Sequence, residues 1–193
     1  MRHLEKLKDK SIYTPLDQKG IVKREIINDL LKDIDVNIIY SSPYLYCFQS
    51  VDNYIKQTET KVIMEHGIRE YMDERLVIDK ENDLPKYIKN HFRINDGYIK
   101  KEELSYPEKE EEFKKRIRRF LRNLIKEHGK EDKRILIISH QSVLNEIISY
   151  AFKSIHKEIP EKYQDLKKYY LRNGEIIKIF DESNWVFKEI KKS

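Results

Sequence analysis

Apolar residues recur along this chain in two patterns, one helical and one typical of buried strands. Between residues 18 and 34 they return every three to four positions, which predicts an amphipathic helix. The same spacing recurs from about residue 108 to 127 and ends before Gly129. Short, almost continuous apolar runs predict buried strands at residues 36–40, 61–64 and 134–139.

Helix and turn signals complete the expected order of elements. Pro43, behind two serines, marks the start of a helix, and Asn173 before Gly174 marks a turn. Strands that alternate with helices predict an α/β sandwich. The chain has 193 residues, which fits a single domain spanning residues 1–193. The remaining expected elements are helices at 44–56, 84–92 and 143–152 and strands at 175–180 and 184–190.

The distribution of charge argues against nucleic acid as a partner. Lys and Arg number 39 and Asp and Glu number 34, which leaves a net charge of +5. The two signs are interspersed, so the chain as a whole sets up no strong field. The helix expected up to residue 127 has a basic face, but its first turn is acidic, as the helix dipole favours. We therefore expect this face to be solvated; its basic residues are Lys114, Lys115, Arg116, Arg118, Arg119 and Arg122.

The remaining composition favours a cytoplasmic protein. Cys47 is the single cysteine, which excludes an internal disulfide framework and suits a reducing compartment. No apolar run approaches the roughly 18 residues of a membrane span, and no signal segment opens the chain. We therefore expect no membrane partner. The oligomeric state stays open, and a homodimer is compatible with the sequence.

Two histidines stand where open α/β sheets place their chemistry. His3 follows Arg2 at the start of the chain, and His140 closes the apolar run that ends at Ser139. A neutral imidazole can attack phosphorus and form a covalent phosphoenzyme, and an arginine offers a planar fork of donors to phosphate oxygens. The pattern indicates phosphoryl transfer. The alternative is that both are ordinary histidines at strand ends.

Phosphoryl transfer also needs an acid for the leaving oxygen. Glu70 follows a predicted strand and is the candidate. The alternative for Glu70 is a surface carboxylate paired with Arg69. A zinc site is not expected, because the other histidines have no metal-ligand spacing among themselves; they are His66, His91, His128 and His156.

Taken together, these segments resemble the histidine phosphatase superfamily, which has the phosphoglycerate mutase-like fold. The resemblance runs through most of the chain, and any one segment alone is weak. The segments are R-H-L-E at residues 2–5, T-P-L-D-Q-K-G at 14–20, I-Y-S-S-P at 39–43 with Gln49 and Ser50 following, G-I-R-E at 67–70 and I-I-S-H at 137–140.

The resemblance implies a role for each candidate residue. His3 would be the phosphorylated nucleophile and Glu70 the proton donor. Arg2 and His140 would bind the phosphoryl group, and no metal or organic cofactor would be needed. The implied architecture is a three-layer α/β/α sandwich. The implied partner is a phosphorylated small molecule or a phosphoprotein.

Three departures from the family pattern bear on activity. Tyr46 stands where the family places a second pocket arginine, so this substrate-binding position carries no charge. Arg69 or Lys6 is a candidate to compensate. Leu4 replaces a glycine beside the nucleophile. Only Met1 precedes Arg2, so the family's usual first strand is expected to be missing or shortened, or the start of the protein lies upstream.

Three functions remain in view. The first is a phosphomonoester hydrolase that acts through a phosphohistidine, with activity reduced by Tyr46. The second is a catalytically impaired phosphate-binding or interaction protein of the same fold. A sugar-phosphate mutase ranks lower, because residues 71–106 lack the paired arginines that the resemblance would require of a mutase.

Overall fold

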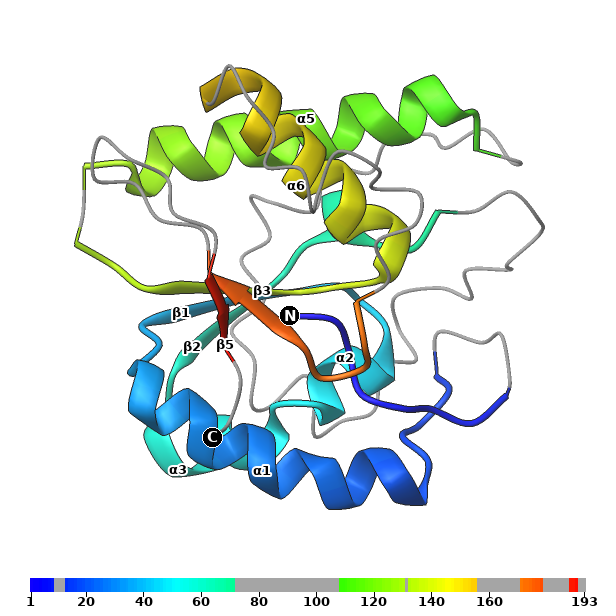
Figure 1. Cartoon of the computed structure of the whole chain (residues 1–193), viewed down its shortest axis with the longest axis vertical. Helices are drawn as coiled ribbons and strands as arrows, with labels where there is room; N and C mark the ends of the chain where they lie inside the picture. The colour runs from blue at the N-terminus through cyan, green and yellow to red at the C-terminus, as the bar shows by residue number, and fades with distance from the viewer. Residues whose placement is uncertain (9–12, 72–107, 131, 156–170, 179–187, 191–193) are drawn as a thin grey trace.

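Three parallel strands form the centre of the structure (Figure 1). The computed structural model describes residues 1–8, 13–71, 108–130, 132–155, 171–178 and 188–190. The strand order is β2-β1-β3, and Ile38 of β1 is in register with Lys61 of β2 and Ile135 of β3. The bounds are β1 Ile38–Ser41, β2 Lys61–Met64 and β3 Ile135–Ile138.

Helices cover both faces of this sheet, with α1 and α3 on one side and α5 and α6 on the other (Figure 1). Side chains of a strand alternate between the two faces. Ile39 accordingly packs in the cluster that includes α1, while Ile38 and Tyr40 pack in the cluster that includes α5 and α6. The predicted three-layer sandwich is confirmed. The helices are α1 Gln18–Ile34, α2 Leu45–Gln49, α3 Asp52–Thr58, η1 His66–Ile68, α5 Glu110–His128 and α6 Gln141–Ile155.

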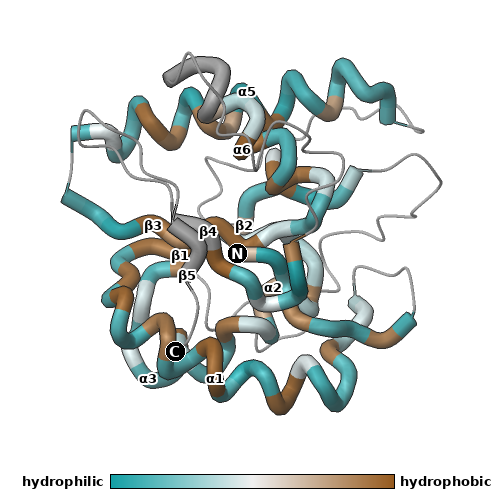
Figure 2. The backbone as a smooth tube through the Cα atoms, in the orientation of Figure 1, coloured by the Kyte–Doolittle hydropathy of each residue, from teal (hydrophilic) through white to brown (hydrophobic). Residues whose placement is uncertain are grey.

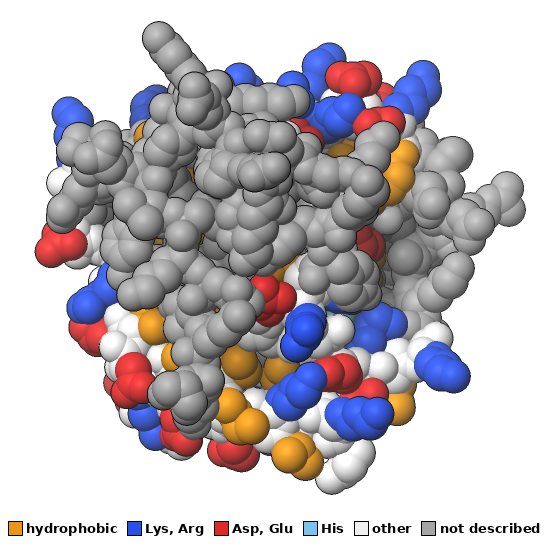
Figure 3. Space-filling view, viewed as in Figure 1, with side chains coloured by type: hydrophobic (Ala, Val, Ile, Leu, Met, Phe, Trp, Pro, Cys, Tyr) orange, Lys and Arg blue, Asp and Glu red, His pale blue; other side chains and the backbone are white. Residues whose placement is uncertain are grey.

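Hydrophobic residues concentrate in the central strands, whereas hydrophobic and hydrophilic residues alternate along the outer helices (Figure 2). The two C-terminal strands pair antiparallel, as β4 Ile176–Lys178 and β5 Lys188–Ile190. The helix expected at 84–92 lies outside the described residues. Positive and negative side chains are mixed over the described part of the face in Figure 3. Among the described residues, no helix is long and apolar enough to cross a membrane.

The helix expected at 44–56 is two short helices instead. The break falls at Val51, whose backbone (φ −131°, ψ 8°) leaves the helical region. Ser50 precedes the break, and its hydroxyl donates to Tyr46 O at 2.6 Å and accepts from Leu4 N at 2.9 Å. The break therefore coincides with a tertiary contact that the local sequence does not encode.

The apolar stripe of α1 is only partly buried. The Asp17 side chain caps the helix by accepting from Gly20 N at 2.9 Å, and a Cβ at Gly20 would lie 2.2 Å from Glu5 O. This close approach docks α1 through Gly20, Ile27 and Leu31, which lie on one side of the helix. The opposite apolar positions are exposed, namely Ile21, Val22 and Ile26.

Residues 1–3 lie beside β3 and pair with it through a single parallel bridge between Arg2 and Ser139. Met1 N donates to Ile137 O at 2.7 Å, Ser139 N to Met1 O at 3.2 Å, and His3 N to Ser139 O at 3.1 Å. On the other edge, Arg2 exchanges two backbone hydrogen bonds of 3.1 Å with residues 174 and 175. This pairing brings His3 beside the end of β3, where His140 follows.

Leu4 is accommodated because a glycine faces it. The Leu4 side chain is fully buried in the core cluster with Ile27. Gly174 has φ +82°, and a Cβ there would lie 2.9 Å from Leu4 Cδ2. The leucine therefore fills space that a side chain at residue 174 would occupy.

Replacing Leu4 with alanine is expected to lower the free energy of unfolding by about 2–5 kcal/mol, because it leaves a cavity in the core. Urea denaturation measures this change. Leu7→Ala is the matched control, because Leu7 is 49% exposed, and it should change the free energy of unfolding by less than about 0.5 kcal/mol. Equal effects of the two substitutions would contradict the placement of Leu4.

Candidate active site

His3 is held with one ring nitrogen committed and the other available. Its Nδ1 lies 2.7 Å from the Leu4 carbonyl oxygen. A carbonyl only accepts, so Nδ1 carries the proton and Nε2 keeps its lone pair. The Asn173 side-chain amide donates to His3 O at 3.0 Å and fixes the backbone at this point. Nε2 is thus the nitrogen that can act as a nucleophile.

His140 faces His3 from the first residue after Ser139. The two ring centroids are 5.4 Å apart, with the planes inclined at 58°. His140 Nε2 lies 2.7 Å from the Ser42 hydroxyl, and Nδ1 lies 3.3 Å from Glu70 Oε2. A carboxylate at Oε2 favours a proton on Nδ1, with Nε2 accepting from Ser42. His140 can then offer its Nδ1–H to an anion in this space.

Tyr46 contacts both imidazoles. Its ring centroid is 4.4 Å from that of His3, and its hydroxyl is 3.2 Å from His140 Nδ1. The pKa of the Tyr46 phenol is raised far above its usual value, mainly because the side chain is buried. The phenol is therefore neutral. Tyr44 adds a second ring at 4.7 Å from His140. The phenol can donate a hydrogen bond here but supplies no positive charge.

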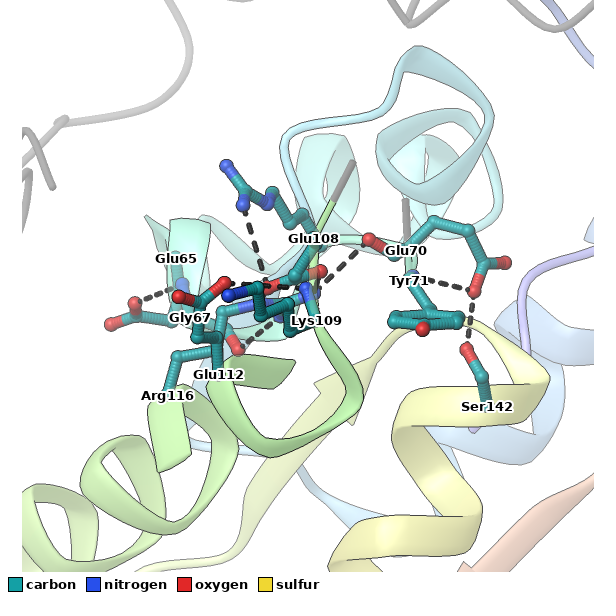
Figure 4. A network of polar contacts seen from close by, with 10 residues as sticks. Glu65, Gly67, Glu70, Tyr71, Glu108, Lys109, Glu112, Arg116 and Ser142 are labelled. Carbon is teal, nitrogen blue, oxygen red and sulfur yellow. Dashed lines mark hydrogen bonds and ion pairs between the residues drawn. The ribbon is translucent and has the colours of Figure 1, made fainter. Parts of the chain in front are cut away.

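Glu70 reaches the same space from the turn after η1. Its Oε1 accepts from Tyr71 N at 2.9 Å and from the Ser142 hydroxyl at the start of α6 (Figure 4). Its Oε2 points to His140. About a third of the Glu70 side chain is exposed, so it lies where the buried pair meets solvent.

A buried ion cluster fixes the turn that carries Glu70 (Figure 4). Arg116 of α5 holds both carboxylate oxygens of Glu108, at 2.5 and 2.9 Å. The same guanidinium donates to Gly67 O at 2.8 Å and to Glu70 O at 3.1 Å. Arg69 lies on the other side of Glu108, at 3.6 Å from Oε1. The backbone at Glu70 is therefore held from behind by α5.

Burial keeps both imidazoles neutral. Desolvation is the largest cause that lowers the pKa of His3 to about 3, and the nearby His140 ring, which would repel His3 if both were protonated, lowers it further. Desolvation likewise lowers the pKa of His140 to about 3, with contributions from Arg116, Arg2 and Lys6. Two neutral rings can stand side by side without repulsion, and His3 keeps its lone pair at neutral pH.

The structure brings together His3, His140, Tyr46 and Glu70. Arg2 lies next to them; its Nη1 donates to Leu171 O at 2.6 Å, and its charge contributes to the low pKa of both histidines. Arg69, expected to bind substrate, is 2% exposed and pairs with Glu108. Its ion pair thus lies in the cluster behind Glu70, and the alternative of a surface pair between Arg69 and Glu70 is wrong.

Two residues at the site were not expected. The sequence marks Ser42 as a helix signal and as part of the segment 39–43 that resembles the family, but it assigns Ser42 no role at the site, where its hydroxyl lies 2.7 Å from His140 Nε2. The sequence predicts Arg116 on the solvated face of α5; this is wrong, because Arg116 is 5% exposed. Its position between Phe113 and Phe120, at spacings of three and four, puts it on their face of the helix. This spacing is the sequence signal from which the burial of Arg116 could have been predicted.

Comparison with protein families assigns the fold to a known group. Residues 4–178 match the model of the histidine phosphatase superfamily, branch 1. The chain belongs to the histidine phosphatase superfamily. The matched span begins directly after His3, so the placement of His3 beside His140 rests on the geometry above. The sequence matches no curated protein.

Solved structures of this superfamily share the fold over the whole chain. An ecdysone phosphate phosphatase from Bombix mori, in complex with tungstate, has a TM-score of 0.69 at 14% identity, covering 100% of this chain and 93% of that one. An alpha-ribazole phosphatase from Shigella flexneri has a TM-score of 0.65 at 18% identity, covering 100% and 94%. A phosphoglycerate mutase from Bacillus anthracis has a TM-score of 0.66 at 17% identity, covering 98% and 89%. At these identities the likeness establishes the fold.

Because the pKa of His3 is low, the free energy of unfolding should fall more steeply with decreasing pH in the wild type than in His3→Gln. Between the unfolded pKa near 6.5 and about 3, the unfolded chain binds a proton at this residue and the folded chain does not, so stability falls as pH falls. Urea denaturation from pH 6 to pH 4 should give slopes that differ by about 1.4 kcal/mol per pH unit. Equal slopes would contradict a buried, neutral His3.

Proposed function

We propose that this member of the superfamily hydrolyses phosphomonoesters through a phosphohistidine on His3. The proposal rests above all on the Nδ1 contact to Leu4 O, which leaves Nε2 of His3 unprotonated in a ring whose centroid is 5.4 Å from that of His140. In the first step Nε2 bonds to phosphorus, the phosphorus–oxygen bond to the alcohol breaks, and Glu70 gives the leaving oxygen its proton. In the second step water attacks phosphorus, its proton passes to Glu70, the phosphorus–nitrogen bond breaks, and phosphate leaves.

The surrounding residues would hold the phosphoryl group during both steps. The proposed donors are the guanidinium of Arg2 and the Nδ1–H of His140, which would turn from Glu70 Oε2 to the phosphoryl oxygens. Such contacts strengthen as charge spreads over the equatorial oxygens. The proposed substrate class is a phosphorylated small molecule or a phosphoprotein, handled in the cytoplasm. No step requires a metal ion or an organic cofactor.

Tyr46 supports a second candidate, a phosphate-binding protein with little or no turnover. The phenol lies against both histidines and adds no charge where a dianion would bind. Losing one charged contact in a transition state costs roughly 10²–10³ in rate. The hydrolase is favoured, because Glu70 is held at the mouth of the site, where a binding protein has no use for an acid.

The purified protein should hydrolyse an aryl phosphate, and His3→Ala should abolish the reaction by removing the nucleophile. A rapid acid-free quench with labelled substrate should trap base-stable, acid-labile phosphate on the wild type and none on His3→Ala. His128→Gln is the matched control, because His128 is a buried histidine whose ring bonds the Tyr40 hydroxyl at 2.9 Å. A folded wild type that binds phosphate without turnover would favour the binding protein.

Glu70→Gln should slow hydrolysis in proportion to how poorly the leaving group departs. The amide cannot donate the proton, so an alkyl phosphate should lose about 10²–10⁴ in kcat/KM, whereas p-nitrophenyl phosphate should lose far less. Steady-state kinetics with a series of leaving groups measures the difference. A uniform loss across the series would mean that Glu70 positions His140 and does not act as the acid.

A further inference from the structure

The site as described has less positive charge than a bound phosphoryl dianion requires. His3 and His140 are neutral rings, and the Tyr46 phenol is neutral as well. Bound phosphate is stabilised mainly by cations that donate hydrogen bonds to its oxygens. The described cations that lower the pKa of His140 are Arg116, Arg2 and Lys6.

The first two of these cations have fixed partners. Arg116 binds both oxygens of Glu108 and two backbone carbonyls from a position behind Glu70. Arg2 donates from Nη1 to Leu171 O at 2.6 Å. Lys6 is the third cation that lowers the pKa of His140.

The backbone at Lys6 is pinned close to the nucleophile. Lys6 pairs with Leu16 in an antiparallel bridge, flanked by hydrogen bonds of 3.1 Å from Leu7 N to Pro15 O and from Asp17 N to Glu5 O. Leu16 N in turn donates to the Gln49 side chain at the end of α2 at 2.8 Å. The Lys6 side chain therefore starts from a fixed point three residues after His3.

The ammonium of Lys6 lies over the ring of Tyr46. Its Nζ is 5.3 Å from the ring centroid, and that centroid is 4.4 Å from His3. Nζ also donates to Leu7 O at 3.2 Å in a solvent-exposed hydrogen bond. An exposed hydrogen bond of this kind is easily exchanged, and the four-carbon stem of lysine allows its charge to turn toward a ligand.

We propose that Lys6 binds the phosphoryl group carried by His3, with its ammonium turning from Leu7 O across the face of Tyr46. This inference rests on the proposed function, because it assigns a further residue to the same site. Tyr46 then has a positive role: its ring guides the lysine charge, and its hydroxyl orients His140.

Isothermal titration with inorganic phosphate tests this role without depending on turnover. Lys6→Met should weaken phosphate binding about ten- to a hundredfold, as expected for a charged hydrogen bond. Lys6→Arg should retain binding within a few-fold. Lys8→Met is the matched control, because it removes the same charge from an exposed position two residues away, and it should bind phosphate as the wild type does.

The outcomes separate this inference from the proposed function. Weakened binding in Lys6→Met alone, in a protein that shows no turnover, would support Lys6 and reject the hydrolase. Normal turnover with unchanged phosphate binding in Lys6→Met would reject Lys6 and leave the hydrolase. If Lys6→Met and Lys8→Met weaken phosphate binding equally, the effect comes from the overall surface charge, and the inference is overturned. A wild type that binds no phosphate would reject both.

Discussion

The backbone pairing of residues 1–3 with β3 is the contact on which the site depends. Hydrogen bonds from Met1, to Met1 and from His3 tie this short segment to Ile137 and Ser139. Because the pairing is parallel, the residues that follow on both strands leave the sheet at the same edge. Two histidines separated by most of the chain thereby come within ring contact. Residues 174 and 175 hold the other side of this three-residue segment through two backbone hydrogen bonds with Arg2.

Burial then sets the chemical state of what this pairing brings together. Desolvation removes the charge from both imidazoles, and the Leu4 carbonyl selects the tautomer of His3. Positive charge surrounds these rings, with Arg2 next to His3 in the chain, Lys6 over Tyr46 and Arg116 behind Glu70. The two imidazoles are thus neutral rings in cationic surroundings.

The far side of the sheet contributes through Arg116 and Glu108. Both are almost fully buried, and removing one partner of such a pair commonly costs about 3–5 kcal/mol. The pair is connected to Glu70 by a backbone hydrogen bond and to η1 through Gly67. Helix α5 therefore does more than cover the sheet, because it fixes the turn that carries the candidate acid.

The sequence predicted the features that depend on local pattern. The strand at residues 61–64 and the helix at 18–34 have the predicted bounds, because their apolar periodicity is clear and their caps are local. Histidines at strand ends were found for the same reason. The break between α2 and α3, the exposed side of α1 and the burial of Arg116 depend on contacts between distant segments. Periodicity can place a side chain on a helix face, as it does for Arg116, but it does not identify the distant segment that covers that face.

The central claim is that His3 is a neutral imidazole protonated on Nδ1, and long-range ¹H–¹⁵N correlation spectroscopy of the histidine rings tests it directly. With His3 assigned by its loss in His3→Gln, the account predicts a protonated Nδ1 and an unprotonated Nε2 from pH 7 down to about pH 4. An imidazolium at pH 6, or a proton on Nε2 at neutral pH, would contradict it.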